Sequence, residues 1–95
     1  MKLSLARMNG RALVAWNLRK LRAERGISQE RLAADTGVDR AYVSELERGL
    51  GNASVDLLDR LAAVLGVPVG AFLKAPPEGA PAPTPLPSGR RAKNG

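Results

Sequence analysis

The distribution of proline restricts where this chain can fold. Six of its seven prolines lie between residues 75 and 95, and the seventh is Pro68. Because proline lacks a backbone N–H and fixes φ, residues 75–95 cannot build a packed helix or sheet, so we expect an extended, disordered tail with a small basic end. Residues 1–12 show no clear hydrophobic period and contain the turn signal Asn9-Gly10, which predicts a flexible basic arm. One folded domain is therefore expected over residues 13–74.

The composition excludes several kinds of chemistry. None of the 95 residues is a cysteine or a histidine, so a disulfide scaffold, a thiol nucleophile, an imidazole base and the common zinc sites are ruled out. The pair Gly49 and Gly51 lacks the further glycine and the strand context of a phosphate-binding loop. We therefore predict that the chain is not an enzyme and needs neither a cofactor nor a metal.

The net positive charge of the chain comes mainly from its two ends. There are 15 basic and 9 acidic residues, a net charge of +6. Residues 1–12 hold three basic and no acidic residues, and residues 75–95 hold three basic residues against Glu78, whereas residues 13–74 are nearly neutral. This pattern favours an anionic partner. No apolar run approaches the ~20 residues of a membrane span. The N-terminus also lacks the order of a signal peptide, so we expect a cytoplasmic protein without membrane contact.

Helix-capping residues and helix-ending glycines divide residues 13–73 into five segments with helical periodicity. No segment alternates polar and apolar residues as a strand does, so we predict an all-α, compact five-helix domain. Ser28, Asp39 and Ser54 are expected to cap the second, third and fourth helices, and Pro68 to stand in the first turn of the fifth. The expected core positions are Val14, Leu18, Leu21 and Arg25; Leu32 and Ala33; Val43, Leu46 and Glu47; Leu58, Leu61 and Leu65, with Leu57 and Val64 at the edges; and Val69, Phe72 and Leu73.

The second and third helices are the most informative feature. They are expected over residues 29 to about 36 and 40 to about 48, with only residues 37–39 between them. A tight turn at Gly37 lets the two helices cross steeply, which is helix-turn-helix geometry. The outer face of the third helix then presents a set that one helix can place in a DNA major groove: Arg40, Ala41, Ser44 and Glu45.

Further motifs stand in a fixed order across the expected domain. They are Leu18-Arg19-x-Leu21-Arg22, Glu24-Arg25-Gly26-Ile27-Ser28-Gln29-Glu30, Gly37-Val38, Val43-Ser44-x-Leu46-Glu47-Arg48-Gly49 and Leu61-Ala62-x-x-Leu65-Gly66-Val67. This ordered set resembles the lambda-repressor-like, or XRE, helix-turn-helix family over nearly the whole folded unit. The resemblance implies a DNA-binding protein, and it implies roles for the residues at matching positions.

The resemblance implies base and phosphate contacts from the two helices. Gln29, at the start of the second helix, would donate to a DNA phosphate, with an exposed residue of no particular role as the alternative. Arg40 would reach guanine O6 and N7, or else a phosphate. Ala41 and Ser44 would face the groove, Ala41 near a thymine methyl, or would only permit close approach.

The other polar residues of the third helix have two interpretations each. Glu45 would accept from cytosine N4 or, as we favour, orient Arg40 or Arg48. Tyr42 would donate its hydroxyl to a phosphate, or would be a partly buried surface aromatic. Asp39 and Arg48, at the two ends of the helix, complete the predicted DNA-binding group.

Asn52 and Ser54 precede the fourth helix, whose backbone N–H groups would hold a second phosphate. The family often has Asn-Pro-Ser here and a basic residue just after the glycine, whereas this chain has Ala53 and Leu50. These departures predict a less rigid loop and one missing phosphate contact, for which the basic arms could compensate.

Arg22 and Glu47 are predicted to have a structural role. In the family, a helix-one arginine and the glutamate near the end of helix three form a buried ion pair, and both residues match here. Trp16 points away from the apolar stripe of the first helix. We expect it to pack within the chain rather than across a dimer.

Two functions from different classes are open at this point. The favoured one is a sequence-specific DNA-binding transcriptional regulator, a dimeric repressor that reads a pseudo-palindromic operator in double-stranded DNA through residues 40–48. The homodimer would form through Val69, Phe72 or Leu73, although these residues could equally close the monomer core. The alternative is an antitoxin-like module that neutralises a partner protein wrapped by the proline-rich tail, with autoregulation of its operon.

Overall fold

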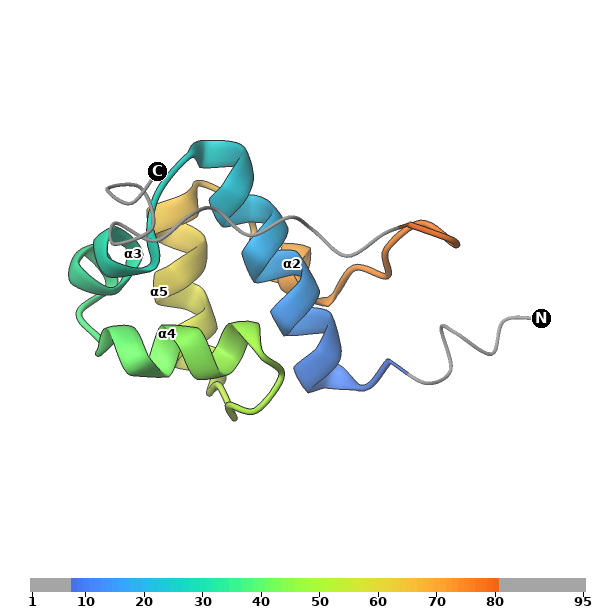
Figure 1. Ribbon diagram of the computed structural model, residues 1–95, viewed down its shortest axis with the longest axis horizontal. Coiled ribbons are helices and arrows are strands. Elements are labelled where there is room, and N and C mark those ends of the chain that lie inside the picture. Colours follow the sequence, from blue (N-terminus) through green and yellow to red (C-terminus); the bar gives the residue numbers. More distant parts are fainter. Residues whose placement is uncertain (1–7, 81–95) are drawn as a thin grey trace, which may run out of the picture.

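The computed structural model describes residues 8–80, and every regular element in that range is helical. The order is α2 (Gly10–Arg25), α3 (Gln29–Thr36), α4 (Arg40–Glu47), α5 (Val55–Leu65) and the 3₁₀ helix η1 (Val69–Leu73) (Figure 1). The predicted all-α class is confirmed. Between residues 8 and 80, no helix combines the length and apolar character that a membrane crossing requires. Most of the predicted arm and tail, residues 1–7 and 81–95, lies outside the described residues.

The first helix begins earlier than its sequence pattern indicated. Asn9 is its N-cap, and the Asn9 Oδ1 accepts a hydrogen bond from the Ala12 N–H at 2.9 Å. The interpretation of Asn9-Gly10 as a turn within a flexible arm was therefore wrong, because the asparagine satisfies one of the free N–H groups of the first helical turn. Residues 10–12 belong to α2 and not to an arm.

One core joins all five elements. Each element contributes one side chain with no solvent exposure: Leu18, Leu32, Val43, Leu61 and Phe72. Four of these are aliphatic, as a chain with three aromatic residues requires. Burying a side chain of this size stabilises a fold by about 1.5–3 kcal/mol, so these contacts supply much of what holds the helices together.

Four of the positions assigned to the core or its edges differ in the structure. Arg25 is exposed, and its Nε donates to the Leu65 carbonyl oxygen at 2.7 Å, where a cation interacts favourably with the C-terminal end of α5. Leu57, expected at an edge, is buried with 5% of its surface exposed. Val69 and Leu73 are 37% and 52% exposed, because the expected fifth α-helix is instead a short 3₁₀ helix that buries Phe72. Pro68 stands at the N-cap of that helix and not in its first turn.

A buried asparagine that the sequence pattern did not reveal ties η1 to α2. The Asn17 Nδ2 donates to the carbonyl oxygens of Leu13, Phe72 and Lys74 at 2.9, 3.0 and 2.9 Å. The bonds to Phe72 and Lys74 hold η1 and the residue that follows it against the middle of α2.

The beginning of the predicted tail also lies beside α2. Pro76, Pro77 and Trp16 line one cleft of about 620 Å³, and Pro77 accepts a backbone hydrogen bond from Ala80 at 2.9 Å. Residues 75–80 are thus placed in the structure, so the predicted boundary at residue 75 falls within the described residues. Trp16 is half-buried beside this segment, which agrees with packing within the chain.

Candidate nucleic-acid interface

The helices α3 and α4 are joined by the tight turn that the sequence predicted. Gly37 has φ +83°, and its N–H donates to the Ala33 carbonyl oxygen at 2.8 Å, closing α3 in the left-handed conformation that glycine favours. The Val38 N–H donates to the same oxygen at 3.1 Å, and the Val38 side chain packs against the core. Ala33 is buried where the two helices meet. Together these contacts produce a helix-turn-helix.

The helix α4 has one buried and one open face. Val43, Leu46 and Glu47 are 0%, 2% and 5% exposed. The other side of the helix follows the lower edge of the molecule in Figure 1. The predicted groove-facing residues lie on that side, where Arg40, Ala41 and Glu45 are exposed and Ser44 is half-buried. The structure therefore brings together the four residues proposed to read a base sequence.

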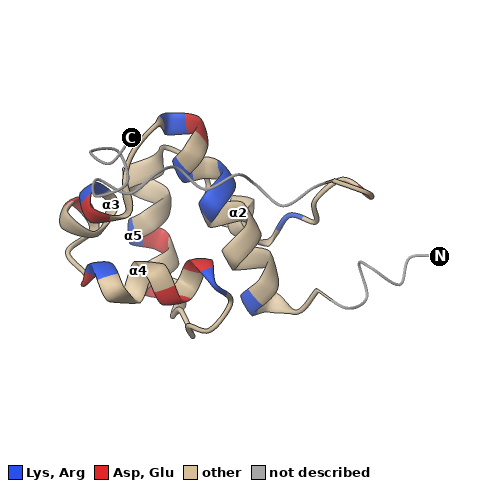
Figure 2. Ribbon diagram, viewed as in Figure 1, with Lys and Arg blue, Asp and Glu red and all other residues tan. Residues whose placement is uncertain are grey.

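The charges along α4 have mixed sign. Arg40 is its first residue, and Arg48 follows its last, with Glu45 and Glu47 between them (Figure 2). Glu47 is buried, so the outer face carries two arginines and one glutamate. The attraction of this face for DNA therefore depends on individual arginines and not on a continuous basic surface.

The expected ion pair is present beneath α4. The Arg22 Nε and Nη2 donate to the two carboxylate oxygens of Glu47 at 2.6 and 2.8 Å. The two side chains are 3% and 5% exposed, and the Arg22 Nη1 also donates to the Ile27 carbonyl oxygen at 2.9 Å. This bidentate ion pair fixes the end of α4 against α2.

Gln29 joins the same network. Its Nε2 donates to the Glu47 Oε1 at 3.0 Å, while the residue itself is half-buried at the first position of α3. An amide group has two N–H bonds, so the second remains for a phosphate. No sequence pattern predicted this link, because Gln29 and Glu47 are 18 residues apart and meet only when α3 and α4 cross.

The expected partner of the α4 arginines was wrong. The Arg40 Nε lies 3.9 Å from the Glu30 Oε2 in the first turn of α3, and within residues 8–80 Glu45 forms no ion pair with Arg40 or Arg48. Arg40 and Glu45 share the outer face but are five positions apart, and not the three or four that bring two side chains of a helix into contact. Arg48 is already the C-cap, where the chain leaves the helix. The sequence did contain a signal for this contact, because the first turn of α3 carries the acidic Glu30 and α4 begins with the basic Arg40.

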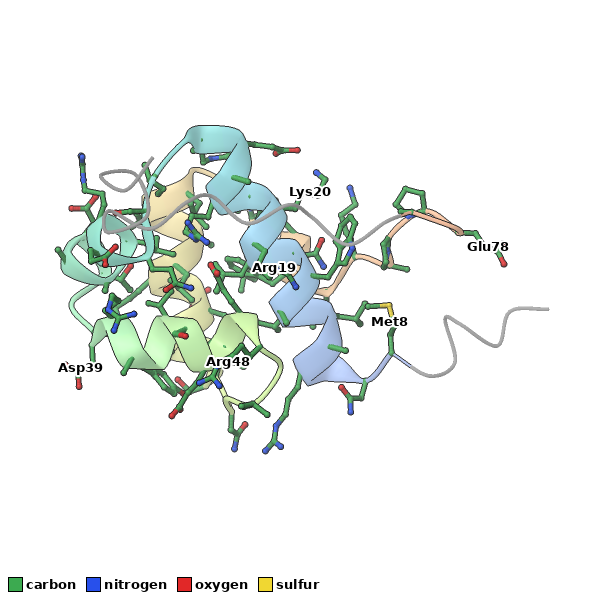
Figure 3. The ribbon with its side chains drawn as sticks, viewed as in Figure 1. Met8, Arg19, Lys20, Asp39, Arg48 and Glu78 are labelled. Atoms are coloured by element: carbon green, nitrogen blue, oxygen red, sulfur yellow. The ribbon has the colours of Figure 1, made fainter. Side chains whose placement is uncertain are left out.

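Asp39 was expected to cap α4 with its side chain, and this prediction was wrong. The residue stands at the N-cap position, but its carboxylate makes no capping hydrogen bond. Its backbone oxygen accepts from the N–H groups of Tyr42 and Val43, at 3.0 and 3.2 Å. The side chain points outward from the start of α4 (Figure 3). Within the described part of the chain, its negative charge is therefore left exposed next to Arg40.

The loop after α4 is held more firmly than its composition predicted. The N–H groups of Leu50 and Gly51 both donate to the Glu45 carbonyl oxygen, at 2.9 and 3.2 Å. The Tyr42 hydroxyl donates to the Asn52 carbonyl oxygen at 2.9 Å. That bond uses the only proton of the phenol, so in this structure Tyr42 positions the loop and has no proton for a phosphate.

Asn52 and Ser54 both precede α5, and Ser54 is its N-cap. Asn52 is exposed, while the Ser54 Oγ accepts from the Leu57 N–H at 3.0 Å, so the predicted cap is confirmed. A side chain that caps the helix is already engaged. Any phosphate contact at this point would therefore use the exposed Asn52 and the backbone of the first turn.

Two short helices crossed at a glycine turn, the second with an exposed face, define the helix-turn-helix class of DNA-binding proteins. The helix-turn-helix family profile matches residues 18–72. The chain belongs to this family and has the XRE-type motif order that its sequence resembled.

Two relatives with similar sequences are named as transcription factors or regulators. A hypothetical transcription factor of Neisseria meningitidis is 43% identical over 68 residues, which is 72% of this chain and 64% of that protein, so this chain spans less than two thirds of its length. An uncharacterized HTH-type transcriptional regulator of Sinorhizobium fredii is 45% identical over 60 residues, 63% of this chain and 78% of that protein.

Two solved structures have the same fold. The crystal structure of the hypothetical transcription factor NHTF from Neisseria superposes with a TM-score of 0.70 at 41% identity, covering 74% of this chain and 80% of that one. The restriction-modification controller protein C.AhdI from Aeromonas hydrophila superposes with a TM-score of 0.61 at 38% identity, covering 63% and 91%. The family is thus one of DNA-binding transcriptional regulators.

Proposed function

We propose that this protein is a dimeric repressor that reads a pseudo-palindromic operator through the outer face of α4. The observation that carries the proposal is the division of that helix. Val43, Leu46 and the Glu47 ion pair fasten one side to the domain, and the other side is open. A recognition helix needs such rigid support, because a base contact depends on side chains held in a fixed position.

Arg40 is the residue we assign to base reading. Its side chain is 52% exposed, and its one ion pair within residues 8–80, with Glu30, is long at 3.9 Å. A weak exposed pair of this kind is easily exchanged for guanine O6 and N7. Ala41 and Ser44 would lie against the bases beside it. Glu45, which orients neither arginine, would accept a hydrogen bond from cytosine N4.

Phosphate contacts would place the helix in the groove. Gln29 would donate its second amide N–H to the DNA backbone, with Glu47 holding the side chain in position. Arg48 and Asn52 are exposed at the other end of α4 and would bind the backbone there. Such contacts supply most of the affinity and make it depend steeply on salt.

A second copy would complete the reading unit. Val69 and Leu73 of η1 are 37% and 52% exposed, which leaves apolar surface that a partner copy could cover. In a symmetric dimer, the two copies of α4 would lie about 34 Å apart and read two half-sites. The relatives named as regulators favour this function over the antitoxin-like alternative.

The test is selection of bound duplexes from a random pool at ~150 mM salt, where non-specific binding is suppressed. An inverted repeat is expected. Arg40→Ala should then reduce discrimination at one base pair of each half-site by about 1–3 kcal/mol while the protein stays folded.

The matched control is Lys20→Ala, which also removes one positive charge. Figure 3 shows Lys20 on α2, on the side of the molecule away from α4. Its removal should leave discrimination unchanged. Recovery of no motif by the folded protein would overturn the proposal, and unchanged base preference in Arg40→Ala would remove Arg40 from the reading group.

A further inference from the structure

We infer that Arg11, at the start of α2, binds a DNA phosphate beside the loop that follows α4. This inference rests on the proposed function and adds a contact to the same interface. Arg11 is exposed in the first turn of α2. It lies outside the two helices of the helix-turn-helix, so neither the motif nor its spacing pointed to it.

The first observation is the position of Arg11. A cleft of about 440 Å³ is lined on one side by Arg11 with Asn9 and Gly10, and on the other by residues 51–53. Figure 1 shows the start of α2 beside the loop that connects α4 to α5. The arginine is therefore next to the backbone that leads from the recognition helix to the N-terminus of α5.

The second observation is the charge of this region. Residues 49–54 contain no lysine or arginine. Their one large hydrophobic side chain, Leu50, is 60% exposed. The first turn of α5 carries the acidic residue Asp56. A carboxylate in this first turn weakens the attraction of the helix end for a phosphate, and a nearby cation would offset that effect.

The third observation is that Arg11 is available. Among the exposed arginines, Arg31 is paired with Asp35 at 2.9 Å and Arg40 lies near Glu30 at 3.9 Å. Arg11 forms no ion pair with any carboxylate between residues 8 and 80. A guanidinium without a carboxylate partner can bind a phosphate without first breaking an ion pair.

The fourth observation is that both sides of the cleft are held in place. The Asn9 side chain caps the start of α2, and the Tyr42 hydroxyl binds the Asn52 carbonyl oxygen across from it. Arg11 is thus presented from a fixed helix end toward a fixed loop. Little ordering of the backbone is required when DNA binds, which favours a contact worth measurable affinity.

The experiment measures operator affinity against salt concentration for wild type, Arg11→Ala, Arg11→Lys and Lys20→Ala, each checked for an unchanged melting transition. A phosphate contact contributes about 0.9 to the slope of log affinity against log salt. Arg11→Ala should weaken binding for all duplexes alike, roughly three- to tenfold per half-site, and in the dimeric complex it should reduce the slope by about two, one for each half-site. Arg11→Lys should keep the slope, because the charge is retained.

Ethylation of single phosphates gives an independent reading. Wild type should be sensitive at one phosphate per half-site at which Arg11→Ala is not. The inference is overturned if Arg11→Ala has the wild-type slope, behaves like Lys20→Ala, or changes base preference.

The two proposals fail in different ways. If wild type selects no operator, the proposed function fails and this contact fails with it. If wild type and Arg40→Ala behave as expected but Arg11→Ala keeps the full slope, only the Arg11 contact is wrong.

Discussion

The buried ion pair between Arg22 and Glu47 makes the domain sensitive to one conservative change, Glu47→Gln. The replacement keeps the shape of the side chain and removes its charge. Arg22 would then remain only 3% exposed, without a counter-ion, and Gln29 would lose the carboxylate to which it donates. Breaking a buried pair by removing one partner costs about 3–5 kcal/mol, because the remaining charge stays desolvated.

That cost is comparable with the whole stability of the domain. About 70 residues in the described domain, at roughly 0.05–0.15 kcal/mol each, give a free energy of unfolding of about 3–10 kcal/mol. Because the amide oxygen introduced by Glu47→Gln could still accept one hydrogen bond from Arg22, we expect a loss near the lower end, about 3 kcal/mol. With a urea dependence of about 1 kcal/mol per molar for a domain of this size, the unfolding midpoint should fall by about 3 M.

Urea unfolding followed by far-ultraviolet circular dichroism measures this loss. The control is Lys20→Ala, which breaks the pair between Lys20 Nζ and Glu24 Oε2 on the same helix α2, also at 2.8 Å but with side chains 44% and 50% exposed. The hydrogen bond from Lys20 lowers the pKa of Glu24, so any stabilisation by this pair is present at neutral pH and lost as the pH falls through the lowered pKa. Because both groups are in water, the control midpoint should not change measurably.

A double variant separates charge burial from packing. Arg22→Met with Glu47→Leu replaces the ion pair by apolar side chains and should recover most of the loss. The reasoning is refuted if Glu47→Gln costs less than about 1 kcal/mol, or if the double variant is less stable than both Arg22→Met and Glu47→Leu as single variants. A loss of DNA binding in Glu47→Gln would have to be compared with its folded fraction first.

Two further predictions concern stability. Thr36 is 5% exposed, and its hydroxyl has no hydrogen-bond partner within the described residues, so Thr36→Val should stabilise the domain by about 1 kcal/mol in urea unfolding. A less stable variant would show that the hydroxyl is satisfied in solution. Gly51→Ala would place a Cβ 2.6 Å from Cδ2 of the buried Leu46, so it should lower stability by about 1–3 kcal/mol. A melting transition equal to that of wild type would contradict this close approach.

Local signals in the sequence predicted most of the elements. Ser28 and Ser54 accept hydrogen bonds from N–H groups three residues ahead, and such a cap depends only on neighbours in the chain. Gly37 ends α3 as expected for the same reason. Helix caps were predicted less well where a residue type is common both in caps and in turns. Asn9 was assigned to a turn although it caps α2, and Asp39 has a capping position without a capping bond.

Contacts between elements were predicted only through the family resemblance. The Arg22–Glu47 pair was expected from the matching motif, because 25 residues separate the two positions and no local pattern links them. Where the resemblance left alternatives open, only the structure showed which partner each side chain has. Arg40 lies near Glu30 and not Glu45, and the Tyr42 hydroxyl binds Asn52.

The helical class, the glycine turn and the outward-facing residues of α4 follow from the order of residues alone, because helical periodicity and backbone preferences act over a few neighbouring positions. The choice of which side chains meet came from packing in three dimensions. Helix crossing brought Gln29 to Glu47 and the start of α2 to residues 51–53. These contacts depend on the angle and depth at which helices pack, and the sum of many side-chain volumes sets both.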